Sequence, residues 1–234
     1  MGFTIEKEIW EMFPGMRLVT VTGKDVDNKT NAPSLGQLLQ NSQAALKETW
    51  QYPNPQSHPN IAAWRQAYQK MGVSGKNYPS AIESLTRRVL TGREVARINP
   101  LVDLYNAISL QHVVPVGGWD IDEMAGGEIS LRLTRGGERF TELGQAESVQ
   151  AAPREVSYAD AEELITRHFV WRQSERAKIT HQTTNFFLIS EILPEVGGQV
   201  AEDVRSSFVE YLREFFKLDV RTAILDSNTS TWDF

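Results

Sequence analysis

The sequence predicts an α+β fold, a single domain in which helices flank a mostly antiparallel sheet or β-sandwich core. Apolar residues at helical spacing dominate the chain before residue 112. Short β-like runs follow, separated by Gly-Gly pairs at 117–118, 126–127 and 136–137. No internal repeat and no biased linker divides the 234 residues. Segregation of helices and strands within one unit is typical of the α+β class.

Residues 1–79 are predicted to form an N-terminal extension of helices and one strand. Its elements are, in order, amphipathic turns over 7–13, an alternating strand over 16–23, a polar loop over 25–31 and helices over 34–50 and 60–71. Ser34 is the expected N-cap of the first long helix, and Gly72 ends the second.

Residues 80–192 are predicted to contain the core, and residues 193–225 a final helix and strand. Ser80 caps a helix that Gly92 ends, and Pro100 occupies the first turn of the next helix, where its missing N–H costs nothing. The later elements are β-like runs at 112–118, 128–134 and 139–144, a helix over 155–169 leading into a strand to 173, a strand or helix over 183–192, a helix over 200–217, a strand over 220–225 and a frayed tail.

Composition and missing motifs exclude several classes of function. The chain has no cysteine, so disulfides, thiolate metal sites and cysteine nucleophiles are excluded. It lacks phosphate-binding glycine motifs, a Gly-x-Ser-x-Gly elbow and any histidine pair at i, i+4. No secretory signal and no apolar run of roughly 20 residues is present. We therefore expect a cytoplasmic protein with a net charge of −6, no metal or other cofactor, and no membrane or DNA partner.

A motif between residues 97 and 127 carries a family resemblance. Asn99-Pro100-Leu101-Val102-Asp103 is followed by Asn106, by Pro115-Val116-Gly117-Gly118-Trp119-Asp120, and then by Asp122 and Gly126-Gly127. This order resembles the editing domain of the bacterial phenylalanyl-tRNA synthetase beta subunit, formed by its third and fourth domains. A second match follows at the expected distance, over 171–175 and 179–185. The resemblance covers about residues 80–192, half of the chain.

The resemblance implies a freestanding editing domain that hydrolyses mischarged aminoacyl-tRNA in trans. Two departures from the family pattern stand out. The family histidine falls on Gly117, and the Gly-Gly pair before the family glutamate has become Gln173-Ser174, with Arg172 beside it. We therefore expect a differently shaped pocket that prefers an amino acid other than tyrosine.

Hydrolysis of an activated ester needs a positioned water, a stabilised oxyanion and a bound substrate ammonium, but no covalent nucleophile. Asn106 and Glu175 are the candidate catalytic residues; each could instead be structural, as a packing amide and as a solvated partner of an arginine. The candidate substrate-binding residues are Asn99, Gly117, Gly118, Trp119, Thr180 and Thr183. The structural alternatives are a helix cap for Asn99, a strand corner for the two glycines, a core position for Trp119 and simple β-propensity for the two threonines.

Arginines at helical spacing form the best basic cluster in this acidic chain. The four are Arg87, Arg88, Arg93 and Arg97. They are candidates for contacting the phosphates of a tRNA acceptor stem, although a solvated helix face would look the same. The leading hypothesis is a deacylase acting on the aminoacylated 3′ end of tRNA, with the amino acid as ligand. A non-catalytic tRNA- or RNA-binding module and a protein that binds a free amino acid or small metabolite are the alternatives.

Overall fold

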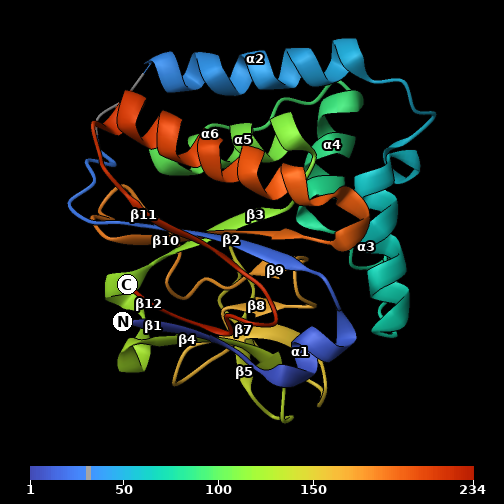
Figure 1. The fold of residues 1–234 in the computed structure, drawn as a ribbon, viewed down its shortest axis with the longest axis vertical. Helices are drawn as coiled ribbons and strands as arrows, with labels where there is room; N and C mark the ends of the chain where they lie inside the picture. The colour runs from blue at the N-terminus through green and yellow to red at the C-terminus, as the bar shows by residue number, and fades with distance from the viewer. Residues whose placement is uncertain (30–32) are drawn as a thin grey trace.

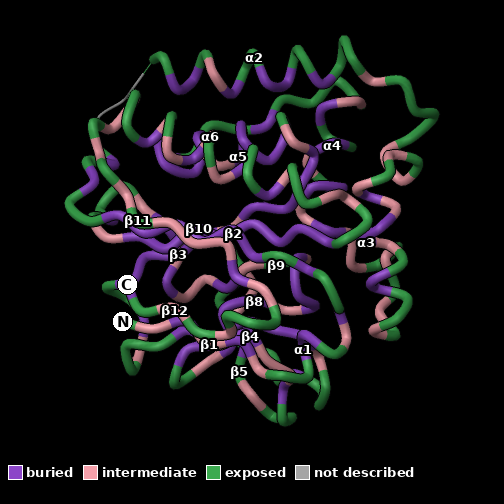
Figure 2. The backbone as a smooth tube through the Cα atoms, viewed as in Figure 1, coloured by how far each residue is buried: buried purple, intermediate pink, exposed green. Residues whose placement is uncertain are grey.

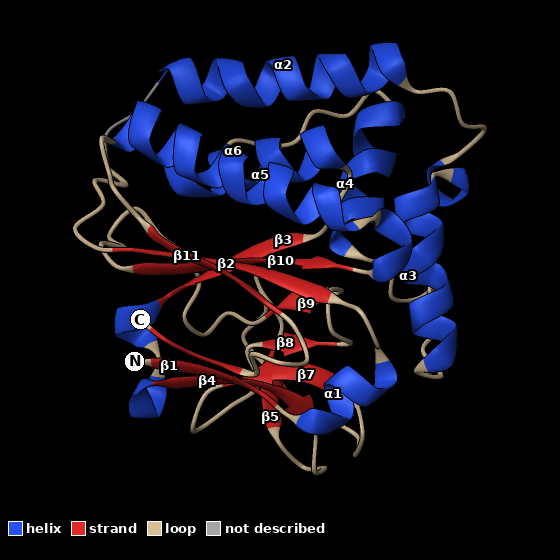
Figure 3. Ribbon diagram, in the orientation of Figure 1, coloured by secondary structure: helices blue, strands red, loops and turns tan. Residues whose placement is uncertain are grey.

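The computed structural model describes residues 1–29 and 33–234 and arranges them in three layers (Figures 1 and 3). A layer of helices covers one four-stranded sheet, whose other face packs on a second four-stranded sheet. The helices are α1 Lys7–Met12, α2 Pro33–Thr49, α3 Pro59–Lys70, α4 Ala81–Leu90, α5 Pro100–His112 and α6 Gly198–Phe216. This confirms the predicted α+β class with a sandwich of sheets flanked by helices.

The first sheet lies beneath the helices and has the strand order β11-β2-β10-β3. Its strands are β2 Arg17–Gly23, β3 Val116–Asp120, β10 Phe186–Ile192 and β11 Arg221–Leu225, all paired antiparallel. Every residue of β10 is buried, so its sequence showed no polar face from which a strand could be told from a helix. Phe186 and Leu188 pack toward the helices, whereas Phe187 and Ile189 pack toward the second sheet.

The second sheet has the order β12-β1-β4-β7. Its strands are β1 Gly2–Ile5, β4 Glu128–Leu133, β7 Val156–Ala159 and β12 Thr231–Asp233, and β1 pairs parallel with β4. The remaining strands form two small ribbons, β5 Arg139–Thr141 with β6 Ser148–Gln150 and β8 Thr166–Arg167 with β9 Arg172–Gln173. Figure 2 shows that β2, β3 and β10 of the first sheet are mostly buried, while the outer surfaces of the helices are exposed.

The C-terminal tail was predicted to be frayed, and this prediction is wrong. Residues 231–233 form β12, which pairs with β1 in the register Phe3↔Trp232. The rings of Trp232 and Phe234 pack on Phe187, with centroids 6.2 and 5.2 Å apart. Aromatic burial between the sheets therefore orders a segment whose polar residues suggested fraying.

The helix predicted over 155–169 is also absent. The chain forms β7 there and then turns into β8. The carboxylate of Asp160 accepts hydrogen bonds from the backbone N–H groups of Glu162 and Glu163, both at 2.8 Å. An aspartate that satisfies two successive N–H groups stabilises a tight turn as well as it would cap a helix. The cap signal was real, but no helix follows it.

The other helical predictions are confirmed to within a few residues. Ser80 caps α4 by accepting from the N–H of Glu83, and Asn99 caps α5 by accepting from the N–H of Val102. Ser34 is not a cap, because α2 already begins at Pro33. The last two residues of the predicted polar loop over 25–31 lie outside the described residues. None of the described helices is long and apolar enough to span a membrane.

Candidate functional site

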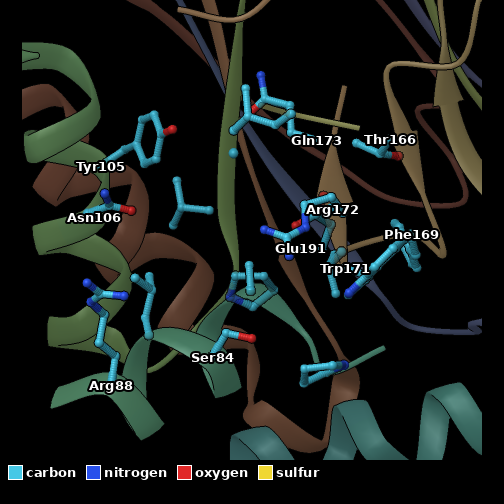
Figure 4. Close-up of a pocket in the computed structure, with 18 of the residues that line it drawn as sticks. Ser84, Arg88, Tyr105, Asn106, Thr166, Phe169, Trp171, Arg172, Gln173 and Glu191 are labelled. Atoms are coloured by element: carbon cyan, nitrogen blue, oxygen red, sulfur yellow. The ribbon is translucent and has the colours of Figure 1, made fainter. Parts of the chain in front are cut away.

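A cavity of about 810 Å³ opens where α4 and α5 meet the free edge of strand β3 and the 166–173 segment (Figure 4). The strand β3 lies at the end of its sheet and pairs with β10 along one side. The other side of the strand is therefore available to a ligand or to another part of the chain. The cavity has three kinds of lining: basic side chains, aromatic rings, and polar groups that are nearly buried.

Strand β3 is open to the cavity at Gly117 and covered beyond it. A Cβ atom built on Gly117 would meet no atom within 4 Å. From Gly118 onward the edge is covered, since the Gln173 side-chain amide donates to the Gly118 carbonyl at 2.8 Å and the Asp120 N–H donates to the Ala177 carbonyl at 2.9 Å. The family histidine position thus faces empty space in this chain.

Asn106 presents a free amide to this cavity from α5 (Figure 4). The residue is only 9% exposed, yet its side chain has no hydrogen-bond partner within residues 1–29 and 33–234. Its amide is not among the solvent-inaccessible unpaired groups, so it reaches the open space of the cavity and is free to bind a ligand. Its neighbour Tyr105 also lines the cavity, and burial, with the charge of Asp103, raises the pKa of its hydroxyl. Both groups are placed to bind a polar ligand.

Glu191 and Tyr158 form the most buried polar pair of the cavity lining. Glu191 is 3% exposed and accepts a 2.7 Å hydrogen bond from the Tyr158 hydroxyl. Burial raises the pKa of Glu191 to about 7, although the hydrogen bond from Tyr158 opposes this. Trp119 packs on Tyr158 with ring centroids 5.0 Å apart, and its indole N–H has no partner in the described structure. Neither Glu191 nor Tyr158 was predicted from the sequence, in which the available signal was a single charge inside the apolar run FFLISEI.

The basic side chains of the lining come from α4, its flanking loops and β9. They are Lys76, Arg87, Arg88, Arg93 and Arg172. Arg87 and Arg172 are paired with Glu83 at 2.5 Å and Glu142 at 3.1 Å, respectively. The other three have no carboxylate partner in the part of the chain that the structure describes. A group of uncompensated cations beside a cavity attracts anions, even on a protein with a net charge of −6.

An ionic network around one buried carboxylate holds α4 in this position. The Glu83 carboxylate, 1% exposed, accepts from Arg65 at 2.6 and 2.8 Å, from Arg87 at 2.5 Å and from Gln56 at 2.8 Å. Burial alone would raise the pKa of Glu83, but hydrogen bonds from Arg65 and Gln56 and the arginine charges hold it below its usual value. Glu83 therefore stays ionised and ties α4 to α3, which fixes the direction of the neighbouring basic side chains.

Asn99, Thr180 and Thr183, three of the predicted substrate-binding residues, lie outside the cavity lining. Together with Asn28 they form a hydrogen-bond network that we call the loop lock. The Asn99 amide donates to the Ile179 carbonyl and accepts from the Asn28 amide and the Val102 N–H. The Thr183 hydroxyl accepts from the Thr180 N–H at 2.9 Å. Both the oxygen and the nitrogen of the Asn99 amide are engaged in this way, so these residues fasten the loop after residue 178 to the start of α5. Gly118, a fourth, is closely packed against Leu188 instead of facing the cavity.

Glu175 and Arg97 also lie outside the lining. The Glu175 carboxylate accepts from the Gly144 N–H at 2.9 Å and pairs with Lys178; these two interactions lower its pKa. Gly144 follows Leu143, which does line the cavity, so Glu175 is placed to position that loop. Arg97 pairs with Asp103 at 3.1 Å. The structure thus brings Asn106, Gly117, Trp119, Arg87, Arg88 and Arg93 together in one site. No three His, Asp or Glu side chains are grouped for metal binding in residues 1–29 and 33–234.

Comparison with known proteins identifies the family of this chain. Residues 63–204 match the model of the B3/4 domain, which is more than half of the sequence, so the chain belongs to the B3/4 domain family. It is 31% identical over 93 residues to the phenylalanine–tRNA ligase beta subunit of Geobacter metallireducens, a match that covers 40% of this chain and 11% of that protein. The suspected relationship to the synthetase beta subunit is thereby confirmed.

A solved structure also resembles this chain. It is an N-terminal fragment of the phenylalanyl-tRNA synthetase beta subunit from Pyrococcus horikoshii, with a TM-score of 0.48 and 13% identity over 94% of this chain and 50% of the fragment. The chain therefore spans half of this fragment and about a tenth of the curated relative.

Proposed function

We propose that the cavity beside β3 binds the aminoacylated 3′ end of tRNA and that the chain hydrolyses mischarged aminoacyl-tRNA in trans. The observation that carries this proposal is the unpartnered, nearly buried amide of Asn106 in a cavity bordered by uncompensated cations. The relationship to a tRNA synthetase beta subunit indicates which polyanion such cations would meet.

The reaction needs no covalent nucleophile from the protein. Water adds to the ester carbonyl carbon, the bond from that carbon to the ribose oxygen breaks, and the ribose oxygen takes up a proton. The amide of Asn106 would accept a hydrogen bond from the attacking water, and the neutral hydroxyl of Tyr105 would donate to the developing oxyanion. Both side chains come from α5, whose start is held by the hydrogen bonds of the Asn99 amide, so their positions are set before the substrate binds.

The basic side chains would hold the RNA. Phosphates of a bent 3′ end would contact Lys76, Arg88 and Arg93, whose charges have no carboxylate partner in the described structure. Glu175 has an indirect role in this proposal, since it would position the loop that carries Leu143. This role differs from direct catalysis, because its carboxylate already has two partners.

A panel of mischarged tRNAs tests the proposal. Loss of the aminoacyl ester should be faster with the protein than without it for at least one amino acid. Asn106→Ala should lower kcat by roughly 100-fold or more, as loss of one preorganised hydrogen-bonding group does in other enzymes. A matched control is Gln111→Ala at the far end of α5, where the side chain binds Ser42 outside the cavity. Unchanged kcat in Asn106→Ala would remove that residue from the mechanism.

A second function is favoured by the empty space at Gly117, where the family pattern has a histidine. In that case the same cavity and cations would bind tRNA without turnover. Tight binding of tRNA together with ester loss no faster than in buffer would establish this second function and reject the first. Absence of both, with a thermal shift caused by free amino acids, would instead identify a protein that binds small metabolites.

A further inference from the structure

Three of the five buried carboxylates among the described residues are paired with arginine, and Glu191 is not one of them. Glu83, Asp103 and Asp160 are buried, and each is paired with at least one arginine. Asp120, also buried, accepts the backbone N–H of Asp122 at the start of a helical turn. In the described structure Glu191 has a single side-chain partner, the neutral hydroxyl of Tyr158. A buried carboxylate is normally compensated by a cation, and here the cation is missing.

The cavity gives a cation a route to Glu191, because this residue is part of the cavity lining. Glu191 lies on the face of β10 that also carries Ile189 and Phe187, between the two sheets, where its neighbours are apolar and aromatic. Glu191, Ile189 and Tyr158 are all part of the cavity lining. The basic side chains that line the cavity come from α4, the loops beside it and β9, and none forms an ion pair with Glu191 in the described residues. A ligand that enters the cavity can therefore reach an uncompensated acid.

The aromatic residues around Glu191 favour the same kind of ligand. Trp119 and Tyr158 pack against each other, and Phe169 and Trp171 also line the cavity. Faces of aromatic rings attract an ammonium group, and the attraction strengthens where water is excluded. An acid among aromatic rings is therefore a suitable environment for a primary ammonium at the end of an aliphatic chain.

We infer that Glu191, with Tyr158 and Trp119, selects aminoacyl groups whose side chain ends in a primary ammonium, such as lysyl or ornithyl groups. This inference rests on the proposed binding of an aminoacyl end in the cavity and adds the class of amino acid. The protein would then remove a cationic amino acid from tRNA, whereas the aliphatic analogue of the same length would bind weakly. Glu191 acts here as a specificity-determining residue and takes no part in bond cleavage.

Ionisation of Glu191 gives the inference a pH signature. The titratable groups that face it are Tyr158 on β7 and Tyr68 on α3; burial, together with the charge of Glu191, raises the pKa of both hydroxyls, so both stay neutral at ordinary pH. Burial raises the pKa of Glu191 itself to about 7. The carboxylate that an ammonium needs is therefore formed as the pH rises through 7, and affinity for an ammonium ligand should increase over the same interval.

The test compares ligands that differ only at the tip of the side chain. The probes are non-hydrolysable 3′-amino-3′-deoxyadenosine amides of lysine and norleucine, which place an ammonium or a methyl group at the same position. Calorimetry at pH 8 should give a Kd at least about thirtyfold lower for the lysyl probe, the lower end of the effect of a buried charge pair. Glu191→Gln, which keeps a hydrogen-bond acceptor for Tyr158, should abolish this preference, and Glu191→Leu should reverse it.

The outcomes separate this inference from the proposed function. Equal affinity of the native protein for the two probes, or a preference that survives in Glu191→Gln, overturns the inference even if mischarged tRNA is hydrolysed. A preference for a neutral hydroxyl- or amide-tipped probe over the lysyl probe also overturns it. Conversely, a Glu191-dependent lysyl preference without any ester hydrolysis supports the inference and rejects only the deacylase proposal. Glu195→Gln serves as the folded control, since it removes an exposed carboxylate that lies outside the cavity lining.

Discussion

Replacement of Glu191 by glutamine should change how the stability of this protein depends on pH. Burial raises the pKa of Glu191 in the folded protein to about 7, against 4.5 for an ordinary glutamate. A carboxyl group whose pKa is higher in the folded than in the unfolded protein stabilises the fold in its protonated form, and this stabilisation is fully present below the unfolded pKa of 4.5. That contribution declines as the pH rises from 4.5 to 7 and is lost above 7.

The size of the effect follows from the difference between the two pKa values, 7 − 4.5, or about 2.5 units. At 1.36 kcal/mol per unit, the native protein should lose about 3 kcal/mol of unfolding free energy across this interval through Glu191 alone. Glutamine has the same shape, can accept from Tyr158 and does not titrate. The free-energy difference between the variant and the native protein should therefore grow by about 2.5 kcal/mol in favour of Glu191→Gln between pH 5 and pH 8, because part of the loss already occurs below pH 5.

Urea unfolding followed by tryptophan fluorescence at pH 5, 6, 7 and 8 measures this difference, because all other titrating groups are common to both proteins. Glu195→Gln, at an exposed position on the turn after β10, is the matched control for the loss of one carboxylate. A difference between Glu191→Gln and the native protein that stays constant over pH 5 to 8 would refute the reasoning. It would mean that Glu191 is already ionised at pH 5 and is compensated by a partner.

Two further predictions concern the edge of β3 and the basic side chains. Gly117→Leu should leave thermal stability unchanged but block ligand binding, because a Cβ at this position meets no atom within 4 Å. Gly118→Ala places a Cβ 2.3 Å from a leucine methyl of β10 and should lower the unfolding free energy by about 1–3 kcal/mol. Equal destabilisation of the two variants would contradict an open edge at Gly117. The double variant Arg88→Glu, Arg93→Glu should weaken tRNA binding at low salt. It should also reduce the steepness of log K against log salt by roughly 1.4–1.8, for two lost phosphate contacts. Arg213→Glu on α6 is the control, and an unchanged slope in the double variant would exclude these two arginines from the RNA contact.

Helices were the elements best predicted from this sequence, because their signals are local. Ser80 and Asn99 cap the helices they were expected to cap, and Pro100 begins α5. The errors arose where long-range contacts decide. Residues 231–233 are ordered by pairing with β1 and by aromatic packing, neither of which can be read from the tail itself. Asp160 gave a correct cap signal, but the turn that it stabilises leads into a strand.

The candidate site was predicted in part for the same physical reason. Arg87, Arg88 and Arg93 were found by their spacing on and just after one helix, and Asn106 by its place in a family motif. Asn99 matched that motif equally well, yet only the fold shows that both the oxygen and the nitrogen of its amide are engaged in the loop lock. Glu191 was missed because a single acid in an apolar strand has no local pattern. Its meaning depends on which residues the sheets place around it.

The two ends of the cavity should contribute to binding in separable ways. Exposed cations act on RNA phosphates through interactions that salt screens within about 10 Å at 0.1 M, so salt should weaken the binding of every aminoacyl-tRNA to a similar degree. Glu191 is buried among aromatic rings, where screening by salt is slight. The ratio of the affinities for lysyl-tRNA and norleucyl-tRNA should therefore stay nearly constant between 50 and about 300 mM salt while each affinity falls. A ratio that collapses with salt would instead show that the preference arises outside the cavity, from the RNA-binding surface.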